Sequence, residues 1–296
     1  MKIVIFSTGI AGRAIYRKLK DIDTIVCFID NNLNLDGKKY NNVDIIHINK
    51  VFTIEFDKIA IGGVWADSMR KQLLELGVLE EKILFIDDTR LDFSTHNRIE
   101  DTDRIVQEFA KLMRDNHISY CIEGSSLLCL LREQNLSDVP DVDILIKSQN
   151  DLKKIWQLLN ESEILNKNKL TKIIYKEDKI LTKKGQIDKI VLQSNIDSAI
   201  AEPTVLDINL AIDIGKYYIM DYTSELYLYF NKEFVDGKNY FHYKNMELLI
   251  PYQEKKYVEL LYGKDWIKPV KEWSYDDYGN LLTTEELINF IKEHKV

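Results

Sequence analysis

Short apolar runs alternate with helical patterns through the first 93 residues, and this alternation constrains the fold more than any other feature. The runs are, in chain order, "KIVIF", "AGRAIYRKLK", "TIVCFID", "KIAIGG", "ADSMRKQLLELG" and "KILFID". Strands that alternate with helices are typical of a parallel sheet with crossover helices. We therefore predict that residues 1–93 form a Rossmann-like α/β domain.

The remainder of the chain, residues 94–296, has a different rhythm. After the polar stretch "DDTRLDFSTHNRIED", an amphipathic helix is expected over residues 101–117, because Ile105, Phe109, Leu112 and Met113 share one face. A strand, a glycine turn, a short helix and a second strand follow, and further strand-like runs extend to about residue 250. Two helical patterns end the chain. We expect an α+β domain here.

Composition limits the functional classes. The chain has 296 residues, 45% of them hydrophobic, and a net charge of −8. This composition is typical of two globular domains, and the acidic balance argues against a nucleic-acid partner. No run reaches the roughly 20 apolar residues of a membrane span, and the N-terminus lacks a signal-peptide layout. We therefore expect a cytoplasmic protein in which Cys27, Cys121 and Cys129 are buried, reduced thiols. The sequence does not indicate the oligomeric state.

The first glycine turn, "FSTGIAGRA", follows a strand and opens a helix. Backbone amides at a helix N-terminus can hold a phosphate, and Asp30 ends the next strand, where a Rossmann fold keeps its ribose-binding acid. The turn is nevertheless Gly-x-x-Gly (Gly9 and Gly12) and not the full Gly-x-Gly-x-x-Gly. Two interpretations stay open: a ligand pocket, or a tight turn that needs glycine for packing.

The stretches "FIDNN" and "GKKYNNVDII" resemble the small Rossmann-like domains attached to bacterial sugar-modifying enzymes. The resemblance covers about residues 1–90. It implies, at most, a sugar-nucleotide or dinucleotide pocket formed around Gly9, Gly12 and Asp30. No Tyr-x-x-x-Lys pair follows in this domain, so the dehydrogenase chemistry of that type is not supported.

Two carboxylates lie inside the apolar run "VPDVDILI". Residues i and i+2 of a strand point to the same face, so Asp141 and Asp143 are expected to project side by side. Two adjacent like charges are costly unless a cation neutralises them, and Mg²⁺ (or Mn²⁺) prefers oxygen ligands of this kind. The pair therefore predicts a metal site, although Asp-x-Asp alone also occurs at solvated strand ends.

A second glycine turn precedes this pair by about 16 residues. Gly124 lets the backbone approach a ligand closely, and Ser125 and Ser126 open a helix whose first amides have no partner within the helix. A turn of this kind could equally be a simple helix cap. Together with the carboxylate pair, it predicts a site that holds a metal-bound phosphate. Arg132 either pairs with a donor phosphate or lies on the helix surface.

These motifs resemble the LicD family of phosphocholine and fukutin-related phosphotransferases, which belongs to the nucleotidyltransferase superfamily. The matching positions are Gly124, Ser125, Ser126, Leu127, Leu128, Arg132, Asp141, Val142, Asp143, Pro251, Tyr257, Tyr262, Gly263 and Trp266. The resemblance spans about residues 101–270. It departs from the family in having "GS" for "GG" and in Val139 and Pro140, which interrupt the usual aspartate run.

The resemblance implies a third carboxylate on a neighbouring strand. "PTVLDINLAIDIG" offers Asp207 and Asp213, and Asp207 matches the family's strand better. The resemblance also implies a Mg²⁺-dependent phosphotransferase that moves a phospho-substituted group from a CDP-activated donor to a cell-surface glycan or its precursor. Such chemistry serves capsule or lipopolysaccharide biosynthesis. The alternatives are a nucleotidyltransferase that releases pyrophosphate from an NTP, and a non-catalytic nucleotide-binding sensor.

Overall fold

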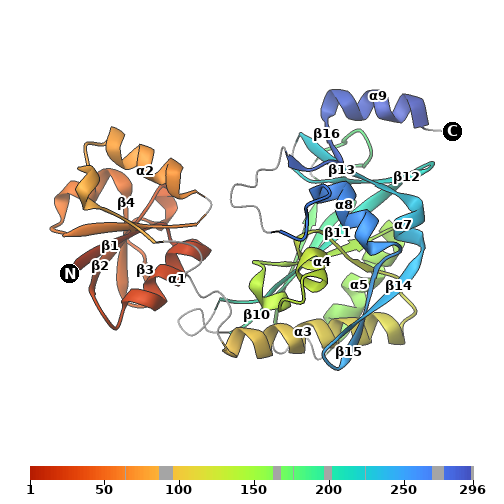
Figure 1. Ribbon diagram of the computed structural model, residues 1–296, viewed down its shortest axis with the longest axis horizontal. Coiled ribbons are helices and arrows are strands. Elements are labelled where there is room, and N and C mark those ends of the chain that lie inside the picture. Colours follow the sequence, from red (N-terminus) through yellow and green to blue (C-terminus); the bar gives the residue numbers. More distant parts are fainter. Residues whose placement is uncertain are drawn as a thin grey trace. The chain divides into compact units, whose positions relative to one another are not determined.

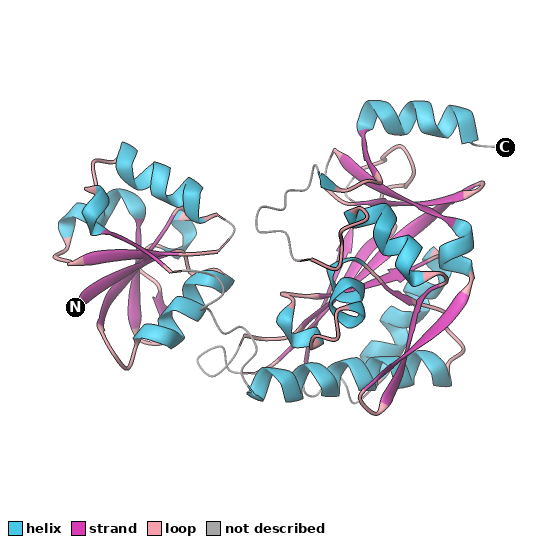
Figure 2. Ribbon diagram, in the orientation of Figure 1, coloured by secondary structure: helices cyan, strands magenta, loops and turns pink. Residues whose placement is uncertain are grey.

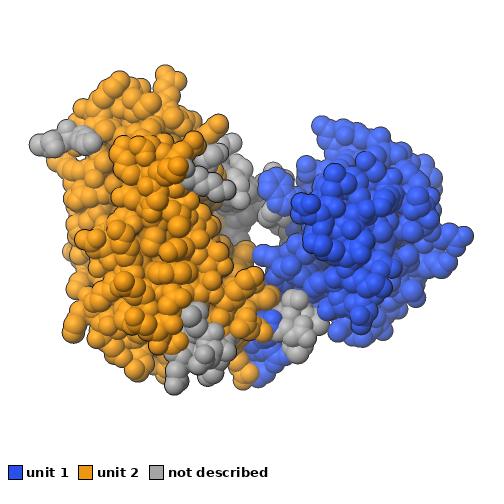
Figure 3. Space-filling view, turned by 180° about the vertical axis from the view of Figure 1, so that it is seen from behind, with its two compact units in different colours: residues 1–98, 196–202 blue, residues 99–195, 203–296 orange. Residues whose placement is uncertain are grey.

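The structure is a computed structural model, and it describes residues 1–63, 65–86, 96–162, 168–175, 177–196, 202–223, 225–268 and 277–294. It divides into two compact units, which Figure 3 colours separately. Unit 1 comprises Met1–Arg98 and Ile196–Glu202, and unit 2 comprises Ile99–Asn195 and Pro203–Val296. The domain boundary predicted at residue 93 lies outside the described residues.

Unit 1 contains a sheet with the strand order β3-β4-β2-β1-β5-β6. All neighbours are parallel except β3, which pairs antiparallel with β4. The strands are β1 (Lys2–Phe6), β2 (Thr24–Asp30), β3 (Lys39–Tyr40), β4 (Val43–His47), β5 (Lys58–Ile61) and β6 (Ile83–Phe85). The α-helices are α1 (Ile10–Leu19) and α2 (Ala66–Glu75), and the short 3₁₀ helices are η1 (Leu33–Leu35), η2 (Ile48–Thr53) and η3 (Glu80–Lys82).

The two faces of this sheet are buried by different helices, as Figure 2 shows. Successive side chains of a strand point to opposite faces. Ile3 and Ile5 accordingly belong to one apolar cluster with Ile15 of α1, whereas Val4 belongs to another with Leu73 of α2. Because helices cover both faces of the sheet, the sequences of its strands are continuous apolar runs. The parallel strands follow the doubly wound order of a Rossmann-like sheet.

Unit 2 is an α+β structure. Among its described residues, eight strands form a mixed sheet with the path β16-β13-β12-β11-β10-β9, and β8 joins it by pairing with β11 and with β7. The strands are β7 (Cys121–Ile122), β8 (Val142–Ile146), β9 (Asn168–Ile174), β10 (Ile187–Ser194), β11 (Val205–Ile214), β12 (Tyr217–Asp221), β13 (Leu226–Asn231) and β16 (Leu281–Thr283), with a separate hairpin of β14 (Lys238–Tyr243) and β15 (Met246–Pro251). Most of its sheet and helices share one large apolar core, and α9 (Thr284–His294) packs in a second, smaller cluster with β11, β12, β13 and β16.

The helices of unit 2 are α3 (His96–Asp115), α4 (Gly124–Leu131), the 3₁₀ turn η5 (Leu136–Asp138), α5 (Gln149–Glu161), α7 (Lys232–Asp236), α8 (Glu254–Tyr262) and α9 (Thr284–His294). Helix α4 packs against β8 and α8, and α5 packs against β9 and β10. Figure 1 shows α4 beside the middle of the sheet, near β11. The predicted fold class, a parallel Rossmann-like α/β domain followed by an α+β domain, is confirmed.

The long helix α3 begins earlier than its periodicity predicts. Phe109 and Met113 are buried as expected and Leu112 is half-buried, but the helix begins at His96 instead of residue 101. Its first turn includes Arg98, whose side chain is almost fully buried. The prediction missed this turn because the periodicity of apolar residues gives no signal for an arginine that is buried.

The expected burial of the cysteines is confirmed. The three thiols, Cys27, Cys121 and Cys129, are buried and unpaired. Burial raises the pKa of Cys27 and of Cys129 to about 12, because a thiolate is poorly solvated there. Within the described part of the chain, no helix is both long enough and apolar enough to cross a bilayer.

Candidate metal and phosphate site in unit 2

Two neighbouring strands bring three carboxylates together. Asp141 directly precedes β8, Asp143 lies in it, and Asp207 of β11 stands directly opposite Asp143 in the parallel register. One carboxylate oxygen from each residue lies within 4.8 Å of the other two. Their neighbours in the strands are buried and apolar, so the register that packs the core also sets the spacing of the acids.

The glycine turn is fitted against the second of these carboxylates. The Glu123 amide donates to the Asp143 carbonyl at 3.1 Å, and Ser125 Oγ donates to Asp143 Oδ2 at 3.2 Å. Gly124 has φ of +57°, and a Cβ there would lie 3.1 Å from Asp143 Oδ2. Glycine is required here because it tolerates both the left-handed backbone and the close approach.

Ser126 fixes the strand that carries the acids. Its buried hydroxyl accepts a hydrogen bond from the Asp143 amide at 2.9 Å and donates to the Asp141 carbonyl at 3.2 Å. The hydroxyl therefore provides hydrogen-bond partners for two main-chain groups at the start of β8, which strand pairing alone does not satisfy. In this geometry Ser126 positions the carboxylates, and its predicted contact with a phosphate stays a prediction.

Burial dominates the electrostatics of the carboxylates. It raises the pKa of Asp143 well above its usual value, and the charges of Glu123, Asp141 and Asp207 raise it further. The pKa of Asp141 is raised by burial and by Asp207, and Lys189 partly offsets this rise. Desolvated acids that repel one another favour protons or a cation at this point.

Lys189 and Glu123 belong to the same neighbourhood as the three carboxylates. Lys189 of β10 forms an ion pair with Asp207 Oδ2. Burial raises the pKa of Glu123 to about 7, while Tyr257 Oη donates to its Oε2 at 3.4 Å. From its place before the turn, Glu123 was expected either to line the pocket or to end a strand, whereas Lys189 was not predicted to have a role. Nothing in the local sequence distinguishes Lys189, because its pairing depends on the register of β10 with β11.

The donor set fits a hard divalent cation. Asp141, Asp143 and Asp207 offer only oxygen atoms, and Asp141 and Asp143 keep partial exposure to solvent. Mg²⁺ and Mn²⁺ take oxygen ligands from a few carboxylates and leave positions open for substrate phosphates. A cation bound here would offset the repulsion that raises the two pKa values.

Two other predicted residues lie elsewhere in unit 2. Asp213, the alternative third carboxylate, is exposed and forms an ion pair with Lys232. Arg132 caps the C-terminus of α4, and its guanidinium donates to the carbonyls of Trp266 and Lys268. This contact ties α4 to the segment after α8, and a role of Arg132 toward a donor phosphate stays a prediction.

The glycine turn of unit 1 is built differently. The amide and the hydroxyl of Thr8 both donate to Asp30 Oδ2, at 2.9 and 2.8 Å, and the Asn32 amide donates to Oδ1 at 2.9 Å. Gly9 is the N-cap of α1, and a Cβ on Gly12 would overlap the Ser7 carbonyl. The geometry supports the packing interpretation of these glycines, and the ligand pocket around them stays a prediction.

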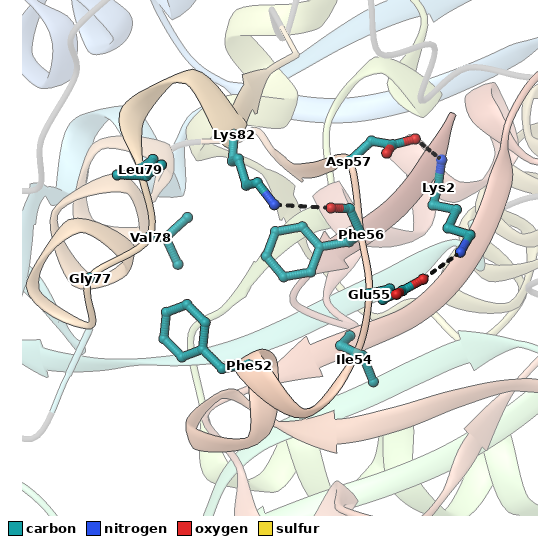
Figure 4. Close-up of a pocket in the computed structure, with 10 residues that line it drawn as sticks. All are labelled: Lys2, Phe52, Ile54, Glu55, Phe56, Asp57, Gly77, Val78, Leu79 and Lys82. Atoms are coloured by element: carbon teal, nitrogen blue, oxygen red, sulfur yellow. Dashed lines mark hydrogen bonds and ion pairs between the residues drawn. The ribbon is translucent and has the colours of Figure 1, made fainter.

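Unit 1 also contains a cavity of about 620 Å³, shown in Figure 4. Lys2, Asp57 and Lys82 lie at or just before the amino ends of β1, β5 and β6, and Phe52 and Phe56 contribute aromatic rings. Lys82 lies 4.7 Å from the centre of the Phe56 ring. Ligands of open α/β sheets bind at the opposite, carboxyl ends of the strands, so this cavity is not the predicted Rossmann pocket.

Comparisons with known proteins give a family model that matches part of the chain and several similar solved structures. A family model described as "C2185-like, N-terminal" matches residues 1–84. No curated protein matches the chain. Similar solved structures include the lincosamide antibiotic adenylyltransferase LnuA with lincomycin bound, at 12% identity and a TM-score of 0.35, covering 60% of this chain and 91% of that one.

Another similar structure is the UDP-N-acetylglucosamine 3-dehydrogenase GnnA of Acidithiobacillus ferrooxidans. It is 8% identical, with a TM-score of 0.24, and the match covers 84% of this chain and 82% of that one. Both neighbours are named as enzymes, but neither similarity is close enough to carry a function to this chain. Membership of the LicD family stays a prediction.

Proposed function

We propose that unit 2 is a metal-dependent transferase of the nucleotidyltransferase type, which cleaves the phosphate linkage of a nucleotide donor and passes a phosphorus-linked group to a hydroxyl acceptor. The convergence of Asp141, Asp143 and Asp207 in front of a glycine-serine turn carries this proposal. Carboxylates on adjacent strands supply the cation site, and the N-terminus of α4 supplies backbone amides for an anion.

In the proposed reaction each residue has a distinct task. Asp141, Asp143 and Asp207 hold the cation, which neutralises charge on the donor phosphates. Gly124 leaves room for the Asp143 carboxylate, and Ser125 orients that carboxylate through its hydrogen bond. One carboxylate accepts the proton of the acceptor hydroxyl as its oxygen attacks the phosphorus in line with the leaving group.

For the donor, we propose a CDP-activated small polar group that moves with its phosphate to a cell-surface glycan or its precursor. The support is the sequence resemblance at Gly124–Leu128, at Asp141–Asp143 and at Tyr262–Trp266. The structure supports the phosphate and metal part alone, since a carboxylate site of this kind accepts a diphosphate whichever base is attached.

The test is a product analysis with matched donors. The chain is incubated with Mg²⁺, an acceptor extract, and CDP-choline, CDP-ribitol or CDP-glycerol, and the release of CMP is measured by chromatography. Parallel reactions contain CTP and are assayed for pyrophosphate, and Asp143→Asn serves as the inactive control. CMP release from a CDP donor is expected. Pyrophosphate from CTP without use of any CDP donor would replace the phosphotransferase with a nucleotidyltransferase. Metal-dependent binding without turnover would indicate a sensor.

A further inference from the structure

Lys189 forms an ion pair at the edge of the carboxylate group. In the antiparallel register of β10 and β11, Lys189 stands opposite Asn209, so Asp207 lies two residues away on the same face. The ammonium group reaches Asp207 Oδ2 diagonally across the two strands. The lysine side chain is 28% exposed, whereas that of Asp207 is 12% exposed. The pair therefore lies where the buried carboxylates meet solvent.

The positive charge of Lys189 acts on more than one acid. Its ammonium group pairs with Asp207, and one carboxylate oxygen each of Asp141 and Asp143 lies within 4.8 Å of an oxygen of Asp207. Lys189 thus partly compensates a group of negative charges that burial makes unfavourable.

A divalent cation bound to Asp207 competes with this ion pair. Oxygen lone pairs of Asp207 that contact Mg²⁺ or Mn²⁺ are no longer available to the ammonium group, and the two positive charges repel at such short range. Lysine is a point charge on a flexible four-carbon stem, so it can move to a new partner without a change in the strand. A phosphate of the donor bound to the same cation would offer such a partner.

We propose that Lys189 is a positioning residue that stabilises the carboxylates as an internal cation when no metal is bound, and that it moves from Asp207 to a phosphate oxygen of the nucleotide when metal and donor bind. This inference rests on the proposed function of the same site. It assigns opposite effects to one side chain: Lys189 weakens binding of the metal alone and strengthens binding of the nucleotide in the presence of metal.

The test uses three variants of the full chain and measures binding instead of turnover. Lys189→Met removes the charge and keeps the length of the side chain, and Lys189→Arg keeps the charge. Lys232→Met is the matched control, because Lys232 also pairs with an aspartate of β11, Asp213, and is 27% exposed. Electron paramagnetic resonance measures Mn²⁺ binding, and calorimetry with Mn²⁺ present measures binding of CTP and of CDP-choline.

For Lys189→Met, we expect Mn²⁺ alone to bind about three- to tenfold more tightly, because it no longer has to displace the ammonium group from Asp207, and the nucleotide to bind about tenfold more weakly, because its phosphate loses one charge-assisted contact. Lys189→Arg should keep both affinities within about threefold of the parent, and Lys232→Met should change neither.

Parallel loss of Mn²⁺ and nucleotide affinity in Lys189→Met, together with a lower melting temperature, would show a purely structural ion pair and overturn the inference. Unchanged affinity for the nucleotide would also overturn it. These failures leave the proposed function intact, because the parent chain still binds. Absence of Mn²⁺ and nucleotide binding in the parent would overturn the proposed function, and this inference with it.

Discussion

The two glycine turns of this chain look alike in sequence but differ in what their aspartates contact. Each turn joins a strand to a helix, and each has an aspartate on the adjacent strand. In unit 1, Asp30 accepts hydrogen bonds from Thr8 and from Asn32. In unit 2, Asp143 faces Asp141 and Asp207 and accepts one from Ser125. An acid whose oxygens accept hydrogen bonds from neighbouring loops supports the fold, whereas an acid that faces other acids favours the binding of a cation.

The largest difference between the two aspartates should appear in catalysis. Asp143→Asn should lower turnover on the order of 10³-fold or more, because it removes a metal ligand that stabilises charge in the transition state. The fold should survive, because the change removes a buried charge that its neighbours repel. Steady-state assays with Mg²⁺, and thermal melting without it, measure the two effects. Asp213→Asn is the control and should keep activity within twofold. Near-normal turnover of Asp143→Asn at saturating Mg²⁺ would place the metal elsewhere.

The two glycines should respond differently to alanine. Gly12→Ala should lower the unfolding free energy by about 3 kcal/mol, because its Cβ overlaps the Ser7 carbonyl and a packed core cannot relax around it. Gly124→Ala should cost about 1–2 kcal/mol for its left-handed backbone, and turnover should fall by about 10- to 100-fold as the methyl group displaces Asp143 Oδ2. Urea denaturation and initial rates separate the two. Unchanged turnover in Gly124→Ala would contradict the role of this turn.

Asp30→Ala should affect stability and leave the transfer reaction unchanged. The substitution removes an acceptor of three hydrogen bonds, at a cost of about 2 kcal/mol for partly exposed donors that water can serve in part. Urea denaturation measures this loss. Calorimetry with NAD and with UDP-N-acetylglucosamine tests the predicted pocket of unit 1. If the parent chain binds one of these ligands, loss of that binding in Asp30→Ala and its retention in Asp36→Ala would show that Asp30 contacts the ligand.

The last prediction concerns the pH dependence of stability in the absence of metal. Burial raises the pKa of Glu123 from 4.5 to about 7, so between these values the native chain holds a proton that the unfolded chain has released. Stability should therefore fall as pH rises from about 4.5 to 7, by about 1.4 kcal/mol per pH unit for each such group. Asp143, whose pKa is also raised, adds to the same trend.

Thermal melting between pH 5 and pH 8 measures this dependence. Glu123→Gln removes one titrating group and reduces the repulsion on Asp143, so its melting temperature should depend less on pH. Saturating Mg²⁺ should oppose the loss at higher pH, because it binds the ionised carboxylates in competition with protons. A melting temperature of the metal-free parent that rises from pH 5 to pH 7 would contradict the burial of these acids.

Local sequence patterns predicted the main strands and helices of this protein and the candidate residues of its site. The alternating apolar runs of residues 1–93 predicted the parallel sheet, because both faces of such a sheet must be covered. The period of two placed Asp141 and Asp143 on one face, and the glycine turn identified the start of α4. These inferences succeed because strand alternation and helix starts depend on residues that are close in sequence.

Tertiary structure decided which of these residues meet. Asp207 and Asp213 are equally good candidates in a single strand, but the pairing of β11 with β8 sets only Asp207 opposite Asp143, and Asp213 pairs with Lys232. The same kind of pairing, between β10 and β11, brings Lys189 to Asp207. Register follows from the packing of a whole core, so residues that lie 18 or 64 positions apart carry no local sign of their contact.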